Sequence, residues 1–344
     1  MKRVLVVLPN WFGETLFATP FLQALKRGLP QTEILALALP QCEPILQHNP
    51  DVARFVPYYE QSGVFGLPLM LRSARQVRPL QADAAIILRK SFSRTLVTKW
   101  AGIPMRVGFS HSKVRRLLTH PVAGPPLAHK AASYLPLLTP FGVSAELAPY
   151  TCTLTDEEKA GARAWMQPPG LKPSQWVMLH PGANWLHKRW PAERFAALGD
   201  RLADAFGVSI AITGGPDDQQ LAQAVATNMR QPSWVWAGRQ SLRQLAACAQ
   251  QAALFVSNDT GVLHLAAAVG GKVLGLYGPT SPALTGPLGP ADRVHVVSRP
   301  DACPQVPCYS ADEPLHLGME ALTVDQVFDA ADQILSSAAG MSGP

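Results

Sequence analysis

Residues 254–282 read LFVSNDTGVLHLAAAVGGKVLGLYGPTSP, and the order of residue types in this stretch decides the fold. Two apolar runs, Leu254–Val256 and Val273–Tyr277, each end in small or polar residues, and a segment of helical character joins them. Short aliphatic strands that alternate with helices indicate a parallel sheet. Because ligands of such sheets bind outside the carboxyl ends of the strands, we expect a binding site where these two strands end.

The residues that follow the first strand suit an anion. The first N–H groups of a helix have no partner within the helix, and the helix dipole adds partial positive charge there. Small residues such as Thr260 and Gly261 leave these N–H groups accessible, which favours a phosphate ligand. Asp259 and His264 can face the same pocket, and Gly278-Pro279 ends the neighbouring strand. A plain helix cap is the alternative for this motif.

The same alternation of strands and helices runs through the rest of the chain. It predicts strands over 4–8, 33–39, 84–88, 176–179, 208–213 and 234–236, and helices over 15–26, 191–206, 219–229 and 242–250. The pattern weakens over 119–175, and we place the inter-domain connection near 155–174. We therefore predict an α/β chain with Rossmann-like, doubly wound domains over 1–160 and 175–325. A last helix over 323–337 is expected to pack back toward the first domain.

Length and composition indicate a globular chain of two domains. It has 344 residues, of which 47% are hydrophobic and 16% charged. Five scattered cysteines make a disulfide framework improbable, and the role of Cys303 and Cys308 stays open. We expect no signal peptide at the N-terminus, and no apolar run approaches the ~20 residues of a membrane span. We expect a cytoplasmic protein, with peripheral contact at a membrane surface as an open option.

Charge divides the chain into two unlike parts. Residues 1–170 carry 19 Lys and Arg against 10 Asp and Glu, a net charge of +9, whereas residues 171–344 carry 11 against 14, a net charge of −3. A basic surface favours an anionic partner. We expect phosphorylated substrate rather than nucleic acid, because no aromatic residues interleave the basic clusters. The basic residues predicted to bind this anionic partner are Arg72, Arg75, Lys90, Arg106, Lys113 and Arg115.

Two further segments carry candidate catalytic residues. In HPGANWLHKRWP (180–191), Lys188 lies between a strand end and a helix start, where its charge can neutralise a diphosphate leaving group. In PNWFGETLFATPFLQALK (9–26), Glu14 follows Gly13 just after the first strand and is a candidate general base. A solvent-exposed loop lysine and a first-turn helix glutamate are the alternatives. The absence of Gly-x-Gly-x-x-Gly and Walker motifs disfavours dinucleotide and ATPase functions.

Four segments, in their order and spacing, resemble a known family. GETLFATPFLQALK (13–26), HPGANWLHKRWP (180–191), SNDTGVLHLAAA (257–268) and LYGPTSP (276–282) look like the ADP-heptose:lipopolysaccharide heptosyltransferases of glycosyltransferase family 9. The resemblance covers about residues 1–335, and PNWFGE (9–14) with SFSRTLVTKWAGIPMRVGF (91–109) looks more like heptosyltransferase II than I.

The resemblance implies a GT-B fold with two domains facing a central cleft, and metal-independent, inverting transfer without a cofactor. It implies ADP-L-glycero-D-manno-heptose as donor and phosphorylated lipopolysaccharide inner core as acceptor. The residues that it assigns to the donor are Gly13, Lys188, Gln219, Gln240, Asp259, Thr260, Gly261, His264, Gly278 and Pro279. It does not select the heptose position on the core.

One departure from the family pattern concerns the base itself. The family usually has Gly-Asp where this chain has Gly13-Glu14, so the carboxylate lies one methylene further out. An error near 1 Å in the position of a catalytic group can lower a rate ~100-fold. Two other functions remain open: a sugar-nucleotide epimerase on the same scaffold, and a non-catalytic protein that binds sugar nucleotide or lipopolysaccharide.

Overall fold

The computed structural model describes residues 1–59, 66–124, 127–167, 175–302, 306–308 and 317–339. The chain divides into two compact units, Met1–Thr153 (unit 1) and Leu154–Pro344 (unit 2). No helix in these described ranges is both long and apolar enough to cross a membrane.

Unit 1 is built on a parallel sheet whose strand order is β3-β2-β1-β4-β5-β6. Val7 is in register with Leu37 on one side and Ile87 on the other, so β1 and β4 are neighbours at the point where the order reverses. Its strands are β1 (Arg3–Val7), β2 (Glu33–Ala38), β3 (Arg54–Pro57), β4 (Ala84–Ile87), β5 (Met105–Phe109) and β6 (His120–Val122). The central strands β1 and β4 are almost wholly buried, as parallel strands covered on both faces should be.

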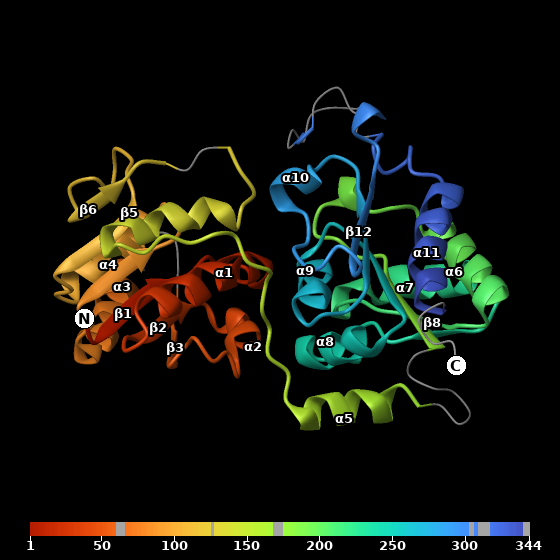
Figure 1. The fold of residues 1–344 in the computed structure, drawn as a ribbon, viewed down its shortest axis with the longest axis horizontal. Helices are drawn as coiled ribbons and strands as arrows, with labels where there is room; N and C mark the ends of the chain where they lie inside the picture. Colours follow the sequence, from red (N-terminus) through yellow and green to blue (C-terminus); the bar gives the residue numbers. More distant parts are fainter. Residues whose placement is uncertain (60–65, 125–126, 168–174, 303–305, 309–316, 340–344) are drawn as a thin grey trace. The chain divides into compact units, whose positions relative to one another are not determined.

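Helices cover this sheet and follow the carboxyl ends of its strands (Figure 1). They are α1 (Phe12–Gly28), α2 (Glu43–Leu46), α3 (Gly66–Val77) and α4 (Phe92–Trp100), with 3-10 helices η1 (Pro40–Cys42), η2 (Arg78–Leu80) and η3 (Ala132–Phe141). Ser91 caps α4 by accepting a hydrogen bond from the Arg94 N–H, which starts that helix four residues after β4 ends.

Unit 2 repeats the topology of unit 1. Its strand order is β12-β11-β10-β7-β8-β9, which is the order of unit 1 read from the other edge, and β7 and β10 flank its reversal point. The strands are β7 (Trp176–His180), β8 (Ser209–Ile212), β9 (Ser233–Val235), β10 (Leu254–Asn258), β11 (Val273–Tyr277) and β12 (Val294–Ser298). The prediction of an α/β chain with two doubly wound sheets is confirmed.

Helices cover this sheet as well. They are α5 (Asp156–Trp165), α6 (Ala192–Phe206), α7 (Gln219–Asn228), α8 (Leu242–Gln251), α9 (Gly261–Ala268), α10 (Pro282–Thr285) and α11 (Val324–Ala339), with η5 (Leu186–Lys188), η6 (Pro216–Asp218) and η7 (Pro300–Ala302). Three of these helices, α6, α7 and α11, bury their apolar faces with strand residues in one large core. Ser241 starts α8 with a capping box closed by Gln244, as the sequence predicts.

The last helix packs within unit 2, and its expected contact with the first domain stays a prediction. Val327, Ala331 and Ile334 of α11 are buried in the core of unit 2 with residues of α6. Figure 1 shows α11 lying beside α6. The apolar stripe of α11 therefore finds its partner within its own unit.

The segment expected to connect the domains also contains regular structure. The boundary between the units falls between Thr153 and Leu154, and α5 begins two residues later with a capping box formed by Thr155 and Glu158. The Glu158 carboxylate also binds the guanidinium of Arg243, one residue into α8. This contact fixes the start of α5 on α8, while residues 168–174 of the expected connection lie outside the described residues.

Candidate functional site

The candidate site of unit 2 lies at the carboxyl ends of β7 and β10. These neighbouring strands end at His180 and Asn258, on either side of the point where the strand order reverses. Doubly wound sheets leave a crevice at that point, because the connections from the two strands go to opposite faces. The two motifs that the sequence marks, 180–191 and 257–264, are the connections that leave these strands.

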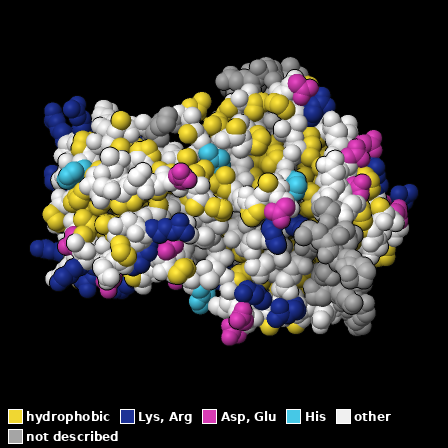
Figure 2. All heavy atoms as spheres, in the orientation of Figure 1, with side chains coloured by type: hydrophobic (Ala, Val, Ile, Leu, Met, Phe, Trp, Pro, Cys, Tyr) yellow, Lys and Arg dark blue, Asp and Glu magenta, His cyan; other side chains and the backbone are white. Residues whose placement is uncertain are grey.

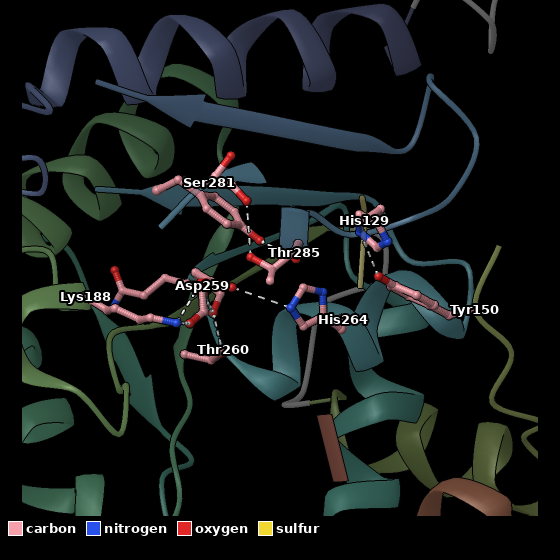
Figure 3. Close-up of polar contacts among 11 residues, drawn as sticks. His129, Tyr150, Lys188, Asp259, Thr260, His264, Ser281 and Thr285 are labelled. Atoms are coloured by element: carbon pink, nitrogen blue, oxygen red, sulfur yellow. Dashed lines mark hydrogen bonds and ion pairs between the residues drawn. The ribbon is translucent and has the colours of Figure 1, made fainter. Parts of the chain in front are cut away.

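Asp259 is the centre of a buried charged cluster. Its Oδ2 lies 2.7 Å from Lys188 Nζ, and its Oδ1 lies 3.5 Å from His264 Nε2. Figure 3 shows the Asp259 carboxylate between Lys188, which comes from η5, and His264, which comes from α9. The side chains of Asp259 and His264 are 5% and 4% exposed, whereas that of Lys188 is 23% exposed. The sequence predicted that Asp259 and His264 face the same pocket, and their side chains do meet; the contact between Asp259 and Lys188 was not predicted.

The charge of Asp259 is stabilised by its partners. Burial alone would raise the pKa of this carboxyl, but the hydrogen bond from His264 and the charge of Lys188 outweigh that effect and hold the pKa well below its usual range. The group is therefore a carboxylate at neutral pH, and Lys188 is its counter-ion. A ligand phosphate that reached Lys188 would compete with Asp259 for this ammonium group.

The start of α9 lies directly beside this cluster. Thr260 is the N-cap in an extended conformation, and its side chain makes no capping bond to the helix. Its hydroxyl lies 3.2 Å from Ser257 Oγ instead. Thr260 and Gly261 are both partly exposed, so the first N–H groups of α9 are open to a ligand.

Asn258 fixes the loop that carries Lys188, a role that the sequence did not suggest. Its Nδ2 donates to the Pro181 carbonyl at 2.8 Å, and its Oδ1 accepts from the Trp190 N–H at 3.1 Å. Asn258 is fully buried. One amide at the end of β10 thus holds both ends of the loop 181–190, between which Lys188 reaches Asp259.

Asp218 is a second residue that the sequence analysis missed. Its carboxylate accepts a hydrogen bond from the Gly215 N–H and lies 3.8 Å from Arg189 Nη2. A Cβ at Gly182 or Gly214 would come within 2.6 Å of an Asp218 side-chain atom, so both glycines leave the room that this carboxylate occupies. The doublet Asp217-Asp218 after a glycine-ended strand was the available signal.

Gln219 and Gln240 follow β8 and β9 on the same side of the sheet. Gln219 is exposed, and its amide lies over Gly238, where an added Cβ would be 2.3 Å from Nε2. Gly238 has a φ of +71°, which favours glycine independently. Gln240 Nε2 lies 3.3 Å from Cys248 Sγ, while its buried Oε1 has no hydrogen-bond partner in the described part of the chain.

Gly278 and Pro279 are buried packing residues and are not exposed to a ligand. A Cβ at Gly278 would lie 2.7 Å from the Met319 backbone nitrogen, and the Pro279 carbonyl accepts a hydrogen bond from the Cys308 N–H. Both residues are buried, so they hold Cys308 and Met319 against the end of β11. Thr280 is 2% exposed, and its hydroxyl has no hydrogen-bond partner within the described ranges.

His180 ends β7 beneath the site. It is 5% exposed, and its Nδ1 lies 3.1 Å from Thr213 Oγ1. Burial lowers the pKa of His180 to about 4, although the charge of Asp218 opposes this shift. His180 is therefore neutral at physiological pH.

The candidate base of unit 1 is paired with a lysine. Glu14 lies in the first turn of α1, and its Oε1 is 2.5 Å from Lys130 Nζ. The two side chains are 26% and 37% exposed. Lys130 was not predicted, since it lies in a segment without periodicity, 116 residues further along the chain. Tyr134 lies nearby, and burial followed by the negative charge of Glu14 raises its pKa.

The loop before Glu14 is held from beneath by a buried arginine. Arg94 of α4 is 1% exposed and donates hydrogen bonds to the Leu8 carbonyl and to Asn10 Oδ1. Gln41 Nε2 donates to the Asn10 carbonyl at 2.7 Å. These contacts fix the turn between β1 and α1, and with it the position from which Glu14 projects.

The basic residues predicted to bind the acceptor are divided between two edges of the sheet. Lys90 and Lys113 follow the carboxyl ends of β4 and β5, which is also the edge of Glu14. Arg75 lies near the end of α3, which returns the chain to the amino end of β4, and Arg72 lies one turn earlier. Arg115 is exposed in the connection between β5 and β6.

Arg106 has a structural role. Its guanidinium donates to the carbonyls of Ile103 and Pro104, just before β5, and of Leu117, near the end of the β5–β6 connection, which ties these two segments together. In Figure 2 the Lys and Arg side chains of unit 1 gather at the left of the view, whereas on unit 2 they alternate with Asp and Glu.

Among the described residues, no group of three or more His, Cys, Asp or Glu side chains could hold a metal ion. Cys42, Cys152, Cys248 and Cys308 are buried, and none of them forms a disulfide within the described ranges. Cys303, the other cysteine that the sequence left open, lies outside the described residues.

Comparison with known proteins gives one consistent family. The sequence model of "Glycosyltransferase family 9 (heptosyltransferase)" matches residues 70–312. The chain is 28% identical over 321 residues to lipopolysaccharide heptosyltransferase 2 of Escherichia coli (strain K12), covering 85% of this chain and 87% of that protein.

Solved structures agree with this match at the level of the fold. ADP-heptose lps heptosyltransferase II of E. coli superimposes with a TM-score of 0.82 and 23% sequence identity, covering 98% of this chain and 100% of that one. The glycosyl transferase family 9 protein of Veillonella parvula DSM 2008 gives a TM-score of 0.87 at 23% identity, covering 98% of both chains. The predicted GT-B fold class is confirmed.

Proposed function

The chain belongs to glycosyltransferase family 9, the heptosyltransferase family, and on that premise we propose that it transfers heptose from ADP-L-glycero-D-manno-heptose to the inner core of lipopolysaccharide. The curated relative named above is, by its name, a lipopolysaccharide heptosyltransferase. The observation that supports the proposal most strongly is the buried Asp259 carboxylate, held by Lys188 and His264 beside the open start of α9.

This arrangement suits a sugar diphosphate because it offers opposite charges to its two parts. In the proposal the diphosphate takes the N–H groups at Thr260 and Gly261 together with the Lys188 ammonium. Asp259, released from Lys188, accepts hydrogen bonds from heptose hydroxyls, and His264 keeps the carboxylate in place. The Asp259 carboxylate alone would repel the negatively charged donor, so the proposed site also needs Lys188, which neutralises it.

The nucleoside part of the donor has candidate partners over β8 and β9. Gln219 is exposed at the start of α7, next to Gly238, and the unsatisfied Gln240 Oε1 can accept a hydrogen bond from an adenine amino group. Each amide side chain can both donate and accept hydrogen bonds. The proposal includes Gly278 and Pro279 only as packing residues behind this site.

The proposed reaction is one displacement with inversion at the anomeric carbon. Glu14 takes the proton of an acceptor hydroxyl, and that oxygen forms a bond to the anomeric carbon of the heptose. The bond from this carbon to the diphosphate oxygen breaks, and the electron pair leaves with ADP. Lys188 and the start of α9 stabilise the charge that develops on ADP, so the proposed transfer needs no divalent metal.

The acceptor side of the proposal rests on the basic residues of unit 1. Lys90 and Lys113 follow strands at the edge where Glu14 lies, and both are exposed. We assign the phosphates of the inner core to these two residues first, with Arg115 as a further contact. Such an acceptor is anchored in lipid, so the proposal places the protein at the cytoplasmic face of the inner membrane during turnover.

Mass spectrometry of lipopolysaccharide tests the proposed function. A strain that lacks this gene is expected to make a core truncated by heptose, and the wild-type gene should restore the missing residue. The Glu14→Gln gene, expressed to the same level, should not. An intact core in the deletion strain would contradict the proposed function.

A further inference from the structure

Glu14 and Lys130 form a pair that the sequence gave no reason to expect. The Glu14 carboxylate makes one hydrogen bond within the described residues, from Lys130 Nζ to Oε1 at 2.5 Å. The second oxygen, Oε2, has no such partner there. Glu14 is 26% exposed, so that oxygen is within reach of solvent and of a substrate.

Lys130 is itself held in place, which distinguishes it from a mobile surface lysine. Its carbonyl accepts a hydrogen bond from Ser133 Oγ at 2.6 Å, and its Nζ lies 5.6 Å from the centre of the Phe17 ring. Phe17 lies on α1, one turn beyond Glu14. The ammonium group therefore contacts two side chains of the same helix face.

The residue before Lys130 anchors the same turn on α1. His129 packs edge-on against Phe17, with ring centres 6.0 Å apart, and its Nδ1 accepts a hydrogen bond from the Ala131 N–H. Its Nε2 lies 3.5 Å from the Tyr150 hydroxyl, and the Tyr150 ring also packs against Phe17. In Figure 3 the His129 and Tyr150 side chains point toward each other. These contacts fix the backbone from which Lys130 reaches Glu14.

We propose that Lys130 is the positioning residue of the Glu14 base: its ammonium holds Oε1 and leaves Oε2 to receive the proton of the acceptor hydroxyl. This inference rests on the proposed function, because it takes Glu14 to be the base. A freely rotating glutamate would spread its carboxylate over several rotamers, and the ion pair selects one of them.

The proposal also explains how Glu14 can act as the base at a position where the family usually has aspartate. An aspartate at position 14 would draw the carboxylate back by about one carbon–carbon bond, roughly 1.5 Å, and break the contact with Lys130. The pair is matched in length, so the two residues depend on each other. Arginine reaches further than lysine and should recover part of the contact to a shorter partner.

Four purified variants test this dependence: Lys130→Met, Glu14→Asp, the double variant Glu14→Asp/Lys130→Arg, and Lys99→Met as control. Lys99 is exposed at the end of α4 and matches the charge change without touching Glu14. Steady-state turnover is measured with ADP-heptose and a core acceptor, and ADP binding is measured by calorimetry. We expect Lys130→Met to lower kcat ~10–100-fold, with the KM for ADP-heptose and the affinity for ADP within about twofold of the control.

The double variant Glu14→Asp/Lys130→Arg makes the test independent of folding defects, because a folding defect cannot raise kcat above that of Glu14→Asp. Glu14→Asp should lower kcat by a similar factor, and adding Lys130→Arg should raise it again at least about fivefold. If Lys130→Met turns over within about twofold of Lys99→Met, or if Lys130→Arg gives no gain in the Glu14→Asp background, the inference is overturned. A Glu14→Gln variant with wild-type turnover would instead overturn the proposed function, so the two failures are distinguishable.

Discussion

Asp259 is the buried charged group of the proposed donor site, and its two partners differ in exposure. Its carboxylate is buried, and it remains charged because Lys188 and His264 contact it from two sides. Lys188 is the more exposed partner, so it is the one that a ligand can draw away. Removing one member of such a pair leaves a buried charge without compensation.

Lys188→Met should therefore weaken both ADP binding and the folded state. We expect ADP affinity to fall ~10–100-fold, as for the loss of one charge-assisted hydrogen bond, and the free energy of unfolding to fall by about 1–3 kcal/mol. The double variant Lys188→Met/Asp259→Asn should regain part of that stability but not the ADP affinity. Calorimetry with ADP and urea denaturation measure the two quantities. Equal stability of the single and double variants would argue against the ion pair.

His180 links folding stability to pH. Its pKa is about 4 in the folded chain, against an ordinary value of 6.5. Between these values the unfolded chain binds more protons, so lowering the pH from about 6.5 to about 4 should reduce the free energy of unfolding by about 1–3 kcal/mol through this residue. Above pH 6.5 the residue should contribute no slope.

The His180→Asn variant isolates that contribution, because an asparagine amide can still meet the Thr213 hydroxyl. Denaturation of wild type and variant at a series of pH values gives the difference directly. The difference should change between pH 6.5 and 4 and be constant above. A difference that is constant through the whole range would rule out a buried neutral His180.

At the scale of elements, the site is built from strand ends and the loops that they anchor. Asn258, the last residue of β10, binds both ends of the loop 181–190 and so sets the position of η5 and Lys188. In unit 1, Arg94 of α4 does the same for the turn that precedes α1. In each unit, a buried side chain on or just after a central strand fixes the loop that carries Lys188 or Glu14.

Asn258→Ala should uncouple the Lys188 loop from the sheet. The substitution leaves the Trp190 N–H and the Pro181 carbonyl without partners in a buried setting, which should lower the free energy of unfolding by about 2–3 kcal/mol. ADP affinity should fall as well, because Lys188 is no longer held. Urea denaturation and ADP titration provide the measurements, with Asn228→Ala as a matched control at the exposed end of α7. A loss no larger than that of the control would contradict this role.

The elements that the sequence predicted correctly are those with buried aliphatic runs or strong caps. β1, β7, β10 and β11 carry such runs, and α8 and α11 begin at Ser241 and Thr323. β3, β5, β6 and β12 were not predicted. β3, β6 and β12 are edge strands that are only partly buried and contain residues such as Pro57, Pro121 and His295. β5 lies inside its sheet, but Arg106 and Gly108 interrupt its apolar run.

In the candidate site, too, residues with a local sequence signal were predicted, and residues placed by tertiary packing were not. The Asp259–His264 and Lys188 motifs are local, since each is a strand end and the turn after it, and such a pattern can be read along the chain. Lys130 was missed because only tertiary packing brings it to Glu14. Asn258 stood within the motif but was assigned no role, since a buried amide contact to another loop leaves no periodic signal.

At the scale of the whole molecule, charge separates the two units of the chain. Unit 1 has 17 Lys and Arg against 7 Asp and Glu, a net charge of +10, whereas unit 2 has 13 against 17, a net charge of −4. Two sheets of the same topology therefore carry opposite net charge, and the proposed function assigns the phosphorylated acceptor to the basic unit. Exposed charges of this kind act over a distance that salt shortens.

Transfer to a phosphorylated core should accordingly depend on ionic strength. Raising salt from about 0.05 to 0.5 M should lower kcat/KM for the acceptor roughly tenfold or more, while an acceptor without phosphates should respond much less. The variant Lys90→Gln/Lys113→Gln should reduce this salt dependence. The same salt response for both acceptors would show that the basic surface does not bind phosphate.

The measurement that tests the central claim most directly is heptose transfer by the purified chain, with ADP-heptose, a core acceptor and excess chelator. Mass spectrometry detects the acceptor one heptose heavier, and ADP release is counted in the same reaction. The account predicts stoichiometric transfer by the wild type and a loss of ~10³-fold or more in Glu14→Gln, which should still bind ADP normally. Transfer that stops without added metal, or that continues unchanged in Glu14→Gln, would contradict it.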